Sequence, residues 1–497
     1  MRTEFERSTP ESVGIPSGSI EWLLDRLEEG WTEPHGLMIM KQDKVIAEGW
    51  WAPYAPGIVH GLQSHTKTYA ATAVGIAVRE GLLSLDERII DIFPEEAPEE
   101  PSENLRQLKV RHVLSMGCGM DEMPKDSVHW VRDFLHIPVN HTPGTAFMYN
   151  SMGSTLLCSM IRKKTGLGLI DYLTPRLFDK IGIDPSHLKC MKMADGIEMG
   201  GGGLFATTED NLRLMKLYLD GGCADGEQIL SEEYVQLATT LQNESYTERA
   251  VNPPAEDNFV GYGYQIWMCR RPGVYRADGA MGQFTIVFPK EKMILAITEN
   301  ASGSTGGVIP QKVLDTIWAW YDSLPENAVL PEDPAASGHL KNRMERLALP
   351  RPVTSRPSAL QQELCGREFN RKEGSFFLKY ENFFEAPNPD DVFTSFSISF
   401  EQDSLIISGT SPDGKRYDLK TAMDGSRKEN LVPGLVGRAL ASACWLSDNL
   451  LRLTLRMVET CNEQYYDFTF TEDQVLIESY SNHTLSQGQK KRALYAC

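Results

Sequence analysis

Hydrophobic and polar positions change their period twice in the first two thirds of the chain. Two apolar runs in GLMIMKQDKVIAEGWW, broken at Gln42 and Asp43, predict a β-hairpin over roughly residues 36–51. Helical spacing follows, as in GSTLLCSMIRKKTG at 153–166, and strand-like runs return in GQFTIVFPKEKMILAITEN at 282–300. This order predicts one antiparallel sheet assembled from both ends of the segment, with helices inserted between them.

The last third of the chain has a different texture. Residues 326–357 are rich in proline and charge and predict a linker between an α+β domain at 1–325 and a second domain at 358–497. In the second domain, short alternating runs such as SFFLKYEN, FTSFSISF and LLRLTLRMVE recur after turn-like segments. Such runs predict an all-β barrel or sandwich.

Composition narrows the classes of partner. The chain has 497 residues, which favours two or three domains, and its 49 basic and 68 acidic residues give a net charge of −19. This charge repels nucleic-acid phosphates and anionic lipid, so neither is an expected partner. The polar N-terminal sequence and the absence of any run of transmembrane length predict a cytoplasmic protein that acts on a small molecule.

Cysteine and histidine positions give no sign of a metal or cofactor. The nine cysteines include no CxxC pair, and no group of histidines and carboxylates has the spacing of metal ligands. We therefore expect neither a disulfide framework, nor a metal site, nor a cofactor.

One pattern suggests chemistry. Ser64 and Lys67 stand three residues apart at the start of an apolar helix, where the helix dipole favours developing negative charge. A second S-x-x-K copy, Ser186 to Lys189, follows Asp184-Pro185 and predicts a surface turn. Burial is costly for a lysine that stays charged, and a lysine that loses its proton can activate a neighbouring hydroxyl. A capped helix with a lysine reaching for solvent is the alternative.

Four stretches in order resemble the serine β-lactamase and penicillin-binding-protein superfamily, in particular its class C β-lactamase-like branch of esterases, D-amino-acid-specific peptidases and oligoamide hydrolases. They are SHTK at 64–67, HTPGTAFMYNSMGSTLL at 141–157, GGGGLFATTEDNLRLM at 200–215 and YRADGAMGQFTIVFP at 275–289. The resemblance implies an antiparallel sheet flanked by helices, with a helical subdomain. The C-terminal part resembles lipocalin-like domains, and we expect it to cover the cleft or to mediate a homo-oligomer.

The resemblance also implies roles for single residues. Ser64 would be the acylated nucleophile and Lys67 its proton relay, while Tyr149 would be the general base, with a pKa lowered by the Lys67 charge. Gly279 matches the glycine of the family's K-T-G or H-x-G motif. The backbone N–H of Ala280 would then join that of Ser64 in an oxyanion hole.

Two departures from the family pattern bear on the substrate. Ser151 stands after Asn150 where the family has the asparagine of Y-x-N, and Ala277-Asp278 stands where the third motif of the family has Lys-Thr or His. Since an aspartate repels a carboxylate, small neutral esters, lactones or amides are favoured over β-lactams. Residues expected to contact substrate are Asn150, Ser151, Asp278, Gly279 and His65.

Other functions remain open. A D-amino-acid peptidase or amidase would use Asp278 to hold a substrate amine, and a weak β-lactamase activity is a further possibility. A non-catalytic ligand- or peptide-binding protein is an alternative of another class.

Overall fold

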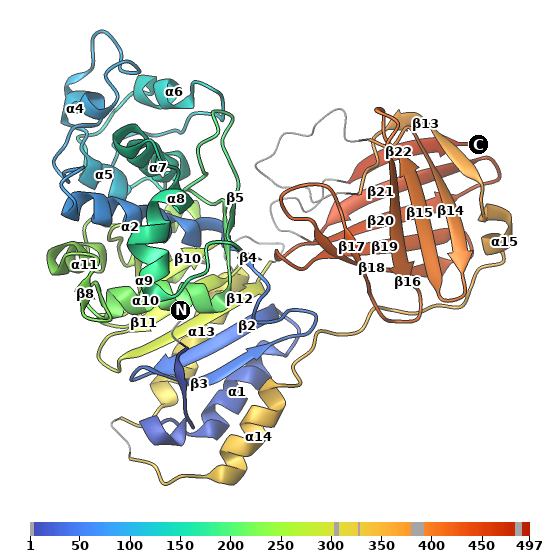
Figure 1. Cartoon of the computed structure of the whole chain (residues 1–497), viewed down its shortest axis with the longest axis horizontal. Coiled ribbons are helices and arrows are strands. Elements are labelled where there is room, and N and C mark those ends of the chain that lie inside the picture. The colour runs from blue at the N-terminus through green and yellow to red at the C-terminus, as the bar shows by residue number, and fades with distance from the viewer. Residues whose placement is uncertain (1–3, 303–307, 327–328, 379–391, 483–489) are drawn as a thin grey trace. The chain divides into compact units, whose positions relative to one another are not determined.

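A computed structural model describes residues 4–302, 308–326, 329–378, 392–482 and 490–497. Its contacts divide the chain into two compact units that meet in sequence between Ala348 and Leu349. Each unit is described by itself below. The first contains the mixed α and β elements and the second is almost entirely β (Figure 1), which confirms the predicted α+β fold class with an all-β C-terminal domain.

A seven-stranded sheet forms the centre of the first unit. Its strand order is β1-β3-β2-β12-β11-β10-β9, and all neighbours are antiparallel except β1 and β3. The predicted hairpin is present as β2 and β3, and the strands predicted near residue 290 are β11 and β12. The bounds are β1 Glu6–Arg7, β2 Glu33–Lys41, β3 Lys44–Trp50, β9 Trp267–Met268, β10 Tyr275–Gly279, β11 Gln283–Phe288 and β12 Met293–Asn300.

Helices lie on both sides of this sheet (Figure 1). On one side α1 (Ser17–Leu27) contacts α13 (Val308–Ser323) and α14 (Pro334–Met344), and α14 also contacts β3. On the other side α10 (Thr208–Leu219) packs on β2, β11 and β12. Thr207 begins α10 with a capping box, in which its hydroxyl accepts the Asp210 N–H and the Asp210 carboxylate accepts the Thr207 N–H.

The helical insert is built around α2 (Thr66–Arg79) and α7 (Ser151–Thr165), which contact each other. Small side chains let α2 be buried almost all round, and Gly75 lies so close to Tyr234 that a Cβ there would come within 2.5 Å of the ring. The shorter helices are α3 Ile89–Ile92, α4 Glu103–Gln107, α5 Val110–Leu114, α6 Trp130–His136, α8 Leu169–Leu173, α9 Asp179–Ile181, α11 Glu232–Ala238 and α12 Glu248–Val251, with single turns η1 Glu11–Val13, η2 Gln63–His65, η3 Thr174–Phe178 and η4 Glu256–Phe259.

Short strands complete the first unit. β6 (Leu204–Ala206) lies between β4 (His60–Gly61) and β5 (Lys189–Cys190), and β7 (Cys223–Ala224) pairs with β8 (Glu227–Gln228). The β4–β6 pairing ties the segment before Ser64 to the segment after the glycine run. Two stretches that are about 140 residues apart in sequence are thereby fixed side by side.

The second unit is a β-barrel. Among the described residues, nine strands close when the edge strand β16 pairs with β18 through Ala422 and Ser442, and β17 pairs with β18 beside them. Inside, Phe376 packs edge to face against the rings of Phe393, Phe396 and Phe468. The bounds are β13 Glu368–Gly374, β14 Ser395–Glu401, β15 Ser404–Thr410, β16 Arg416–Ala422, β17 Lys428–Leu431, β18 Arg438–Ser447, β19 Leu450–Met457, β20 Glu463–Phe470, β21 Gln474–Ser481 and β22 Lys491–Ala496, with one helix, α15 Leu360–Leu364.

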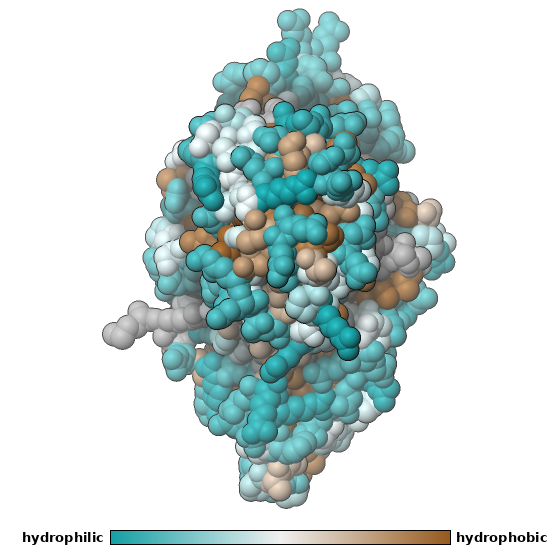
Figure 2. Space-filling view, turned by 90° about the vertical axis from the view of Figure 1, so that its right-hand side faces the viewer, coloured by the Kyte–Doolittle hydropathy of each residue, from teal (hydrophilic) through white to brown (hydrophobic). Residues whose placement is uncertain are grey.

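The barrel agrees with the expected all-β domain, whereas the specific lipocalin likeness stays a prediction. The sequence run SFFLKYEN extends into 379–391, which lies outside the described residues. Hydrophilic residues cover most of the face in Figure 2, with smaller apolar groups between them.

The predicted linker contains α14, which packs on the first unit, and the boundaries at 325 and 358 stay a prediction. None of the described helices has the length and apolar character needed to cross a membrane.

Candidate active site

Ser64 lies in the single turn η2, between β4 and the first residue of α2. Gln63, the residue before it, has a φ of +52°, in the left-handed region that non-glycine residues rarely occupy. Such backbone strain is typical of functional turns. The turn leaves Ser64 half-buried at the start of α2.

Lys67 is held beside Ser64 in the first turn of α2. Its Nζ lies 2.9 Å from the Ser64 Oγ and also donates to the Gly201 carbonyl. The Lys67 residue is only 1% exposed. Burial lowers the pKa of Lys67 from 10.5 to about 7, although the Asp278 carboxylate acts to raise it. At neutral pH this amine is therefore present in both charged and uncharged forms.

The glycine run supplies the second acceptor for Lys67. A Cβ on Gly201 would lie 2.3 Å from the Ser151 carbonyl oxygen, and a Cβ on Gly200 would lie 2.4 Å from the Cys158 Sγ. Only glycine allows this segment to approach α7 so closely. This close approach places the Gly201 carbonyl beside the Lys67 amine. The sequence predicted only close packing for these glycines.

Tyr149 lies between an aromatic cluster and the lysine. Its ring stacks on Trp267 with centroids 5.6 Å apart and packs on the cluster of Met116, Phe147, Tyr262 and Trp267. The Lys67 Nζ stands 4.8 Å from the Tyr149 ring centroid, and the Ser64 side chain acts to lower the pKa of the phenol. The structure thus brings together Ser64, Lys67 and Tyr149, which come from segments far apart in sequence.

The pKa of Tyr149 corrects one expectation. Burial raises this pKa, and the hydrogen bond with Ser64 offsets only part of the effect, so Tyr149 keeps its proton near neutral pH. We had expected the Lys67 charge to lower the pKa. Lys67 lies over the ring face and is itself partly uncharged, so desolvation of the phenolate dominates. Near neutral pH Tyr149 therefore presents a phenol, not a phenolate, beside Ser64.

Gly279 brings the end of β10 against the turn that holds Ser64. A Cβ on Gly279 would lie 2.1 Å from the Leu62 carbonyl oxygen, and β10 contacts η2. Ala280 follows directly, so its N–H belongs to a segment adjacent to that of Ser64. The assignment of these two N–H groups to an oxyanion hole stays a prediction.

Asp278 is part of an ion pair that the sequence did not reveal. The Arg276 Nε lies 2.7 Å from the Asp278 Oδ2, and the Arg276 side chain is fully buried whereas that of Asp278 is 18% exposed. Burial raises the pKa of Asp278, and Arg276 acts to lower it. The two residues share a face of β10 because strand side chains alternate, and this i, i+2 spacing was the available signal.

Three other predicted contact residues have different surroundings. Asn150 begins α7: its Oδ1 accepts the Gly153 N–H at 2.7 Å, while its Nδ2 is buried and finds no partner among the described residues. Ser151 is the half-buried first residue of α7. The His65 ring is 1% exposed and bonds to the Thr285 hydroxyl at 2.9 Å, which places it in the interior of the first unit and away from solvent.

No group of three or more potential metal-ligating side chains occurs in the described parts of the chain. The second S-x-x-K copy lies in an exposed turn at Ser186, as predicted. The chemistry that the assembled groups favour is attack by a serine hydroxyl with a neighbouring amine as base.

Comparisons with known proteins identify a family and named relatives. Residues 24–315 match the family described as Beta-lactamase. The 6-aminohexanoate-dimer hydrolase of Paenarthrobacter ureafaciens is 26% identical over 240 residues, which are 43% of this chain and 58% of that protein, so the match spans less than two thirds of that relative. A putative D-alanyl-D-alanine carboxypeptidase of Escherichia coli K12 is 20% identical over 379 residues, 59% of this chain and 85% of that protein.

A solved structure supports the same fold. The putative 6-aminohexanoate-dimer hydrolase from Bacillus anthracis has a TM-score of 0.50 and 19% sequence identity, covering 65% of this chain and 89% of its own. At that level of identity the likeness concerns the fold.

Proposed function

The chain belongs to the Beta-lactamase family, whose members are hydrolases with the serine β-lactamase fold, and we propose that it is a serine hydrolase that forms an acyl-enzyme with small ester, lactone or amide substrates. One observation carries the proposal: the Ser64 Oγ lies 2.9 Å from the amine of a buried lysine, and the pKa of that lysine is about 7.

The depressed pKa decides the role of Lys67. A lysine with the ordinary pKa of 10.5 is uncharged in only about one molecule in three thousand at pH 7, whereas a lysine with a pKa near 7 is uncharged in about half. A base is most effective when its pKa is close to the working pH. The uncharged Lys67 amine takes the proton of Ser64 while the Ser64 oxygen bonds to the substrate carbonyl carbon.

The remaining steps follow from the neighbours of Ser64. The carbonyl oxygen becomes negative, and the N–H groups of Ser64 and Ala280 stabilise it. Tyr149 gives its phenolic proton to the leaving alcohol or amine as the carbonyl–oxygen or carbonyl–nitrogen bond breaks, and regains a proton from the Lys67 ammonium. Water then attacks the acyl-enzyme and loses its proton to Lys67, and Ser64 leaves with a proton.

The charge at the third motif favours substrates without a carboxylate. Arg276 is fully buried and engaged, so the partly exposed group of the pair is the Asp278 carboxylate. A substrate carboxylate there would meet like charge. We therefore expect β-lactams to be side substrates at most.

Amide hydrolysis is the second candidate. Two relatives are named as a hydrolase of the 6-aminohexanoate dimer and as a putative D-alanyl-D-alanine carboxypeptidase. In a D-amino-acid peptidase or amidase, Asp278 would hold the substrate amine.

A fluorophosphonate probe with intact-mass measurement tests the proposal. The wild-type protein should gain one adduct, Ser64→Ala should gain none, and Ser186→Ala, the matched change in the second S-x-x-K copy, should label like wild type. A folded wild-type protein that stays unlabelled would favour the non-catalytic binding alternative. Rates on p-nitrophenyl esters, D- and L-aminoacyl anilides and a chromogenic cephalosporin then separate the substrate classes.

A further inference from the structure

Arg276 lies at the junction of the candidate site and a polar network behind it. Its Nη2 lies 2.5 Å from the Asn258 Oδ1, and its Nη1 lies 3.3 Å from the Met268 carbonyl oxygen. Its Nε is bonded to Asp278 at 2.7 Å. The guanidinium thus has partners on three sides, and Asp278 is the only one of these three that bears a charge.

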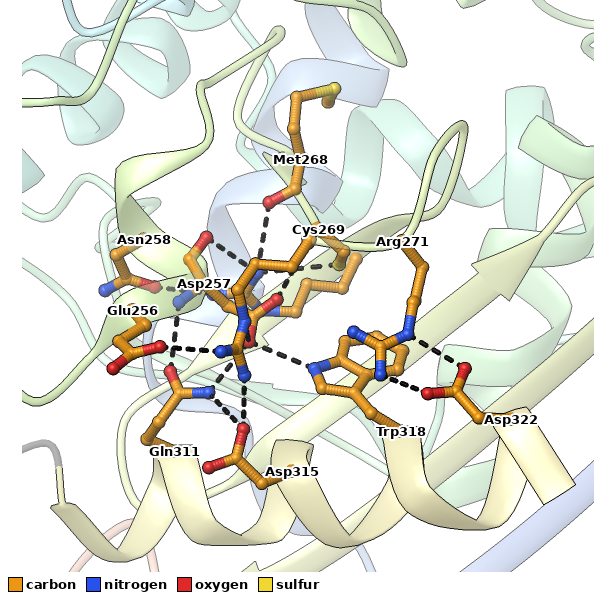
Figure 3. A network of polar contacts seen from close by, with 12 residues as sticks. Glu256, Asp257, Asn258, Met268, Cys269, Arg271, Gln311, Asp315, Trp318 and Asp322 are labelled. Carbon is orange, nitrogen blue, oxygen red and sulfur yellow. Dashed lines mark hydrogen bonds and ion pairs between the residues drawn. The ribbon is translucent and has the colours of Figure 1, made fainter.

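The network fixes this guanidinium in place. Figure 3 shows Asp257 of η4 next to α13, with Gln311 and Trp318 of α13 pointing toward it. The Asp257 Oδ2 accepts the Gln311 Nε2 at 2.8 Å and the Trp318 Nε1 at 3.0 Å, and its neighbour Asn258 holds Arg276. Arg270 covers the outer side, with its Nε 2.9 Å from the same oxygen. A buried, fully bonded network of this kind has little freedom to rearrange.

A stack of rings also connects Arg276 to the lysine. The Arg276 guanidinium lies 5.7 Å from the Trp267 ring centroid, Trp267 stacks on Tyr149, and the Lys67 Nζ lies 4.8 Å from the Tyr149 ring centroid. Each ring of the stacked pair therefore has a cation over it. Both positions are favourable for a cation over a ring face.

The groups around Lys67 come from four elements. η2 gives the Ser64 hydroxyl, the glycine run gives the Gly201 carbonyl, and the segment before α7 gives the Tyr149 ring. The fourth element is β10, which contacts η2 and carries Asp278, whose carboxylate acts to raise the pKa of Lys67. Glu248 of α12 acts on Tyr149. Among these described groups Asp278 is the carboxylate that acts on Lys67, and Arg276 is its ion-pair partner.

We propose that the Arg276–Asp278 ion pair sets the charge state of Lys67: Arg276 favours the ionised form of the partly exposed Asp278 carboxylate, and that carboxylate keeps Lys67 from losing its proton too readily. Both are positioning residues, since they act through Lys67. This inference rests on the proposed role of Lys67 as the base for Ser64. It assigns a function to the aspartate that replaces the family's cationic motif.

The sign of each effect follows from the charges. Burial alone lowers the pKa of Lys67 and the Asp278 carboxylate opposes that change, so loss of the carboxylate lowers this pKa further. Arg276 acts to lower the pKa of Asp278 against the effect of burial, so loss of Arg276 raises this pKa and favours the uncharged carboxyl. Removal of either charge should therefore let Lys67 become uncharged at lower pH.

The test is the rate of fluorophosphonate labelling of the full chain from pH 4.5 to pH 9. In Asp278→Asn the pH at which the labelling rate rises should be lower than in wild type by about one unit. Arg276→Gln should move it in the same direction, and Arg276→Lys, which keeps the charge, should restore the wild-type position. Arg271→Gln, which removes a cation paired with Asp322, is the control and should leave the position unchanged.

Each outcome decides between explanations. A purely structural role would lower the rate at every pH without moving the rise. The proposal is overturned if the rise in Asp278→Asn stays in place or moves to higher pH, or if Arg276→Gln moves it upward. Failure of the wild type to label at Ser64 would instead overturn the proposed function, so the two failures are distinguishable.

Discussion

Lys67→Met offers a quantitative test of the buried amine, because methionine fills a similar volume without a charge. The pKa of Lys67 is about 7 in the folded protein and 10.5 is its ordinary value. Between these values the unfolded chain binds more protons than the folded chain, so wild-type stability rises with pH. The destabilisation of the folded state by Lys67 amounts to about 5 kcal/mol at pH 6 and about 2 kcal/mol at pH 9.

The Lys67→Met variant removes this pH-dependent destabilisation and also loses the contacts of Lys67 with Ser64 and Gly201. Hydrogen bonds contribute about 1 kcal/mol each and do not titrate with Lys67, so the change with pH isolates the charge. The stability of Lys67→Met relative to wild type should therefore fall by about 3 kcal/mol from pH 6 to pH 9.

Urea denaturation of both proteins at several pH values measures the difference. Lys216→Met is the control, since two carboxylates hold Lys216 and the pKa of this lysine is raised. Its difference from wild type should stay constant between pH 6 and pH 9. A constant difference for Lys67→Met as well would refute a depressed pKa at Lys67.

Three further predictions concern single contacts. Tyr149→Phe keeps the stack on Trp267 and should slow hydrolysis of an activated ester by about 10²- to 10⁴-fold with an unchanged melting temperature; wild-type turnover would exclude the phenol as proton donor. Gly279→Ala places a Cβ 2.1 Å from the Leu62 carbonyl and should slow probe labelling, whereas Gly57→Ala, with open space around its Cβ, should not. Burial raises the pKa of Glu299 to about 8, so the contribution of Glu299 to stability is lost as pH rises from 4.5 through 8. The melting temperature of Glu299→Gln relative to wild type should therefore rise over that pH range. A difference in melting temperature that stays constant with pH would contradict this prediction.

The sequence was sufficient for the residues whose chemistry depends on local spacing. Ser64 and Lys67 are one helical turn apart, so their contact followed once the segment was predicted to be helical. Tyr149 was identified only through the order of the motifs, because its approach to Ser64 depends on how α7 packs on α2. The resemblance, not periodicity, supplied that contact.

The features of the site that could not be predicted from the sequence are those that depend on burial. The sequence shows Asp278 as a lone acid, and only the fold shows that Arg276 is buried beside it. The raised pKa of Tyr149 likewise results from desolvation by an aromatic cluster assembled from several segments. Residue types and spacing carry little information on such desolvation, which is why the direction of the Tyr149 pKa shift could not be predicted from them.

The most direct test of the central claim is the pH dependence of acylation at Ser64, followed by peptide mass spectrometry to locate the adduct. We expect a single modified residue, Ser64, and a rate that rises to a plateau with a midpoint near pH 7, where Lys67 loses its proton. An adduct on another residue, or a rate that keeps rising toward pH 10 as for an ordinary lysine, would contradict the account.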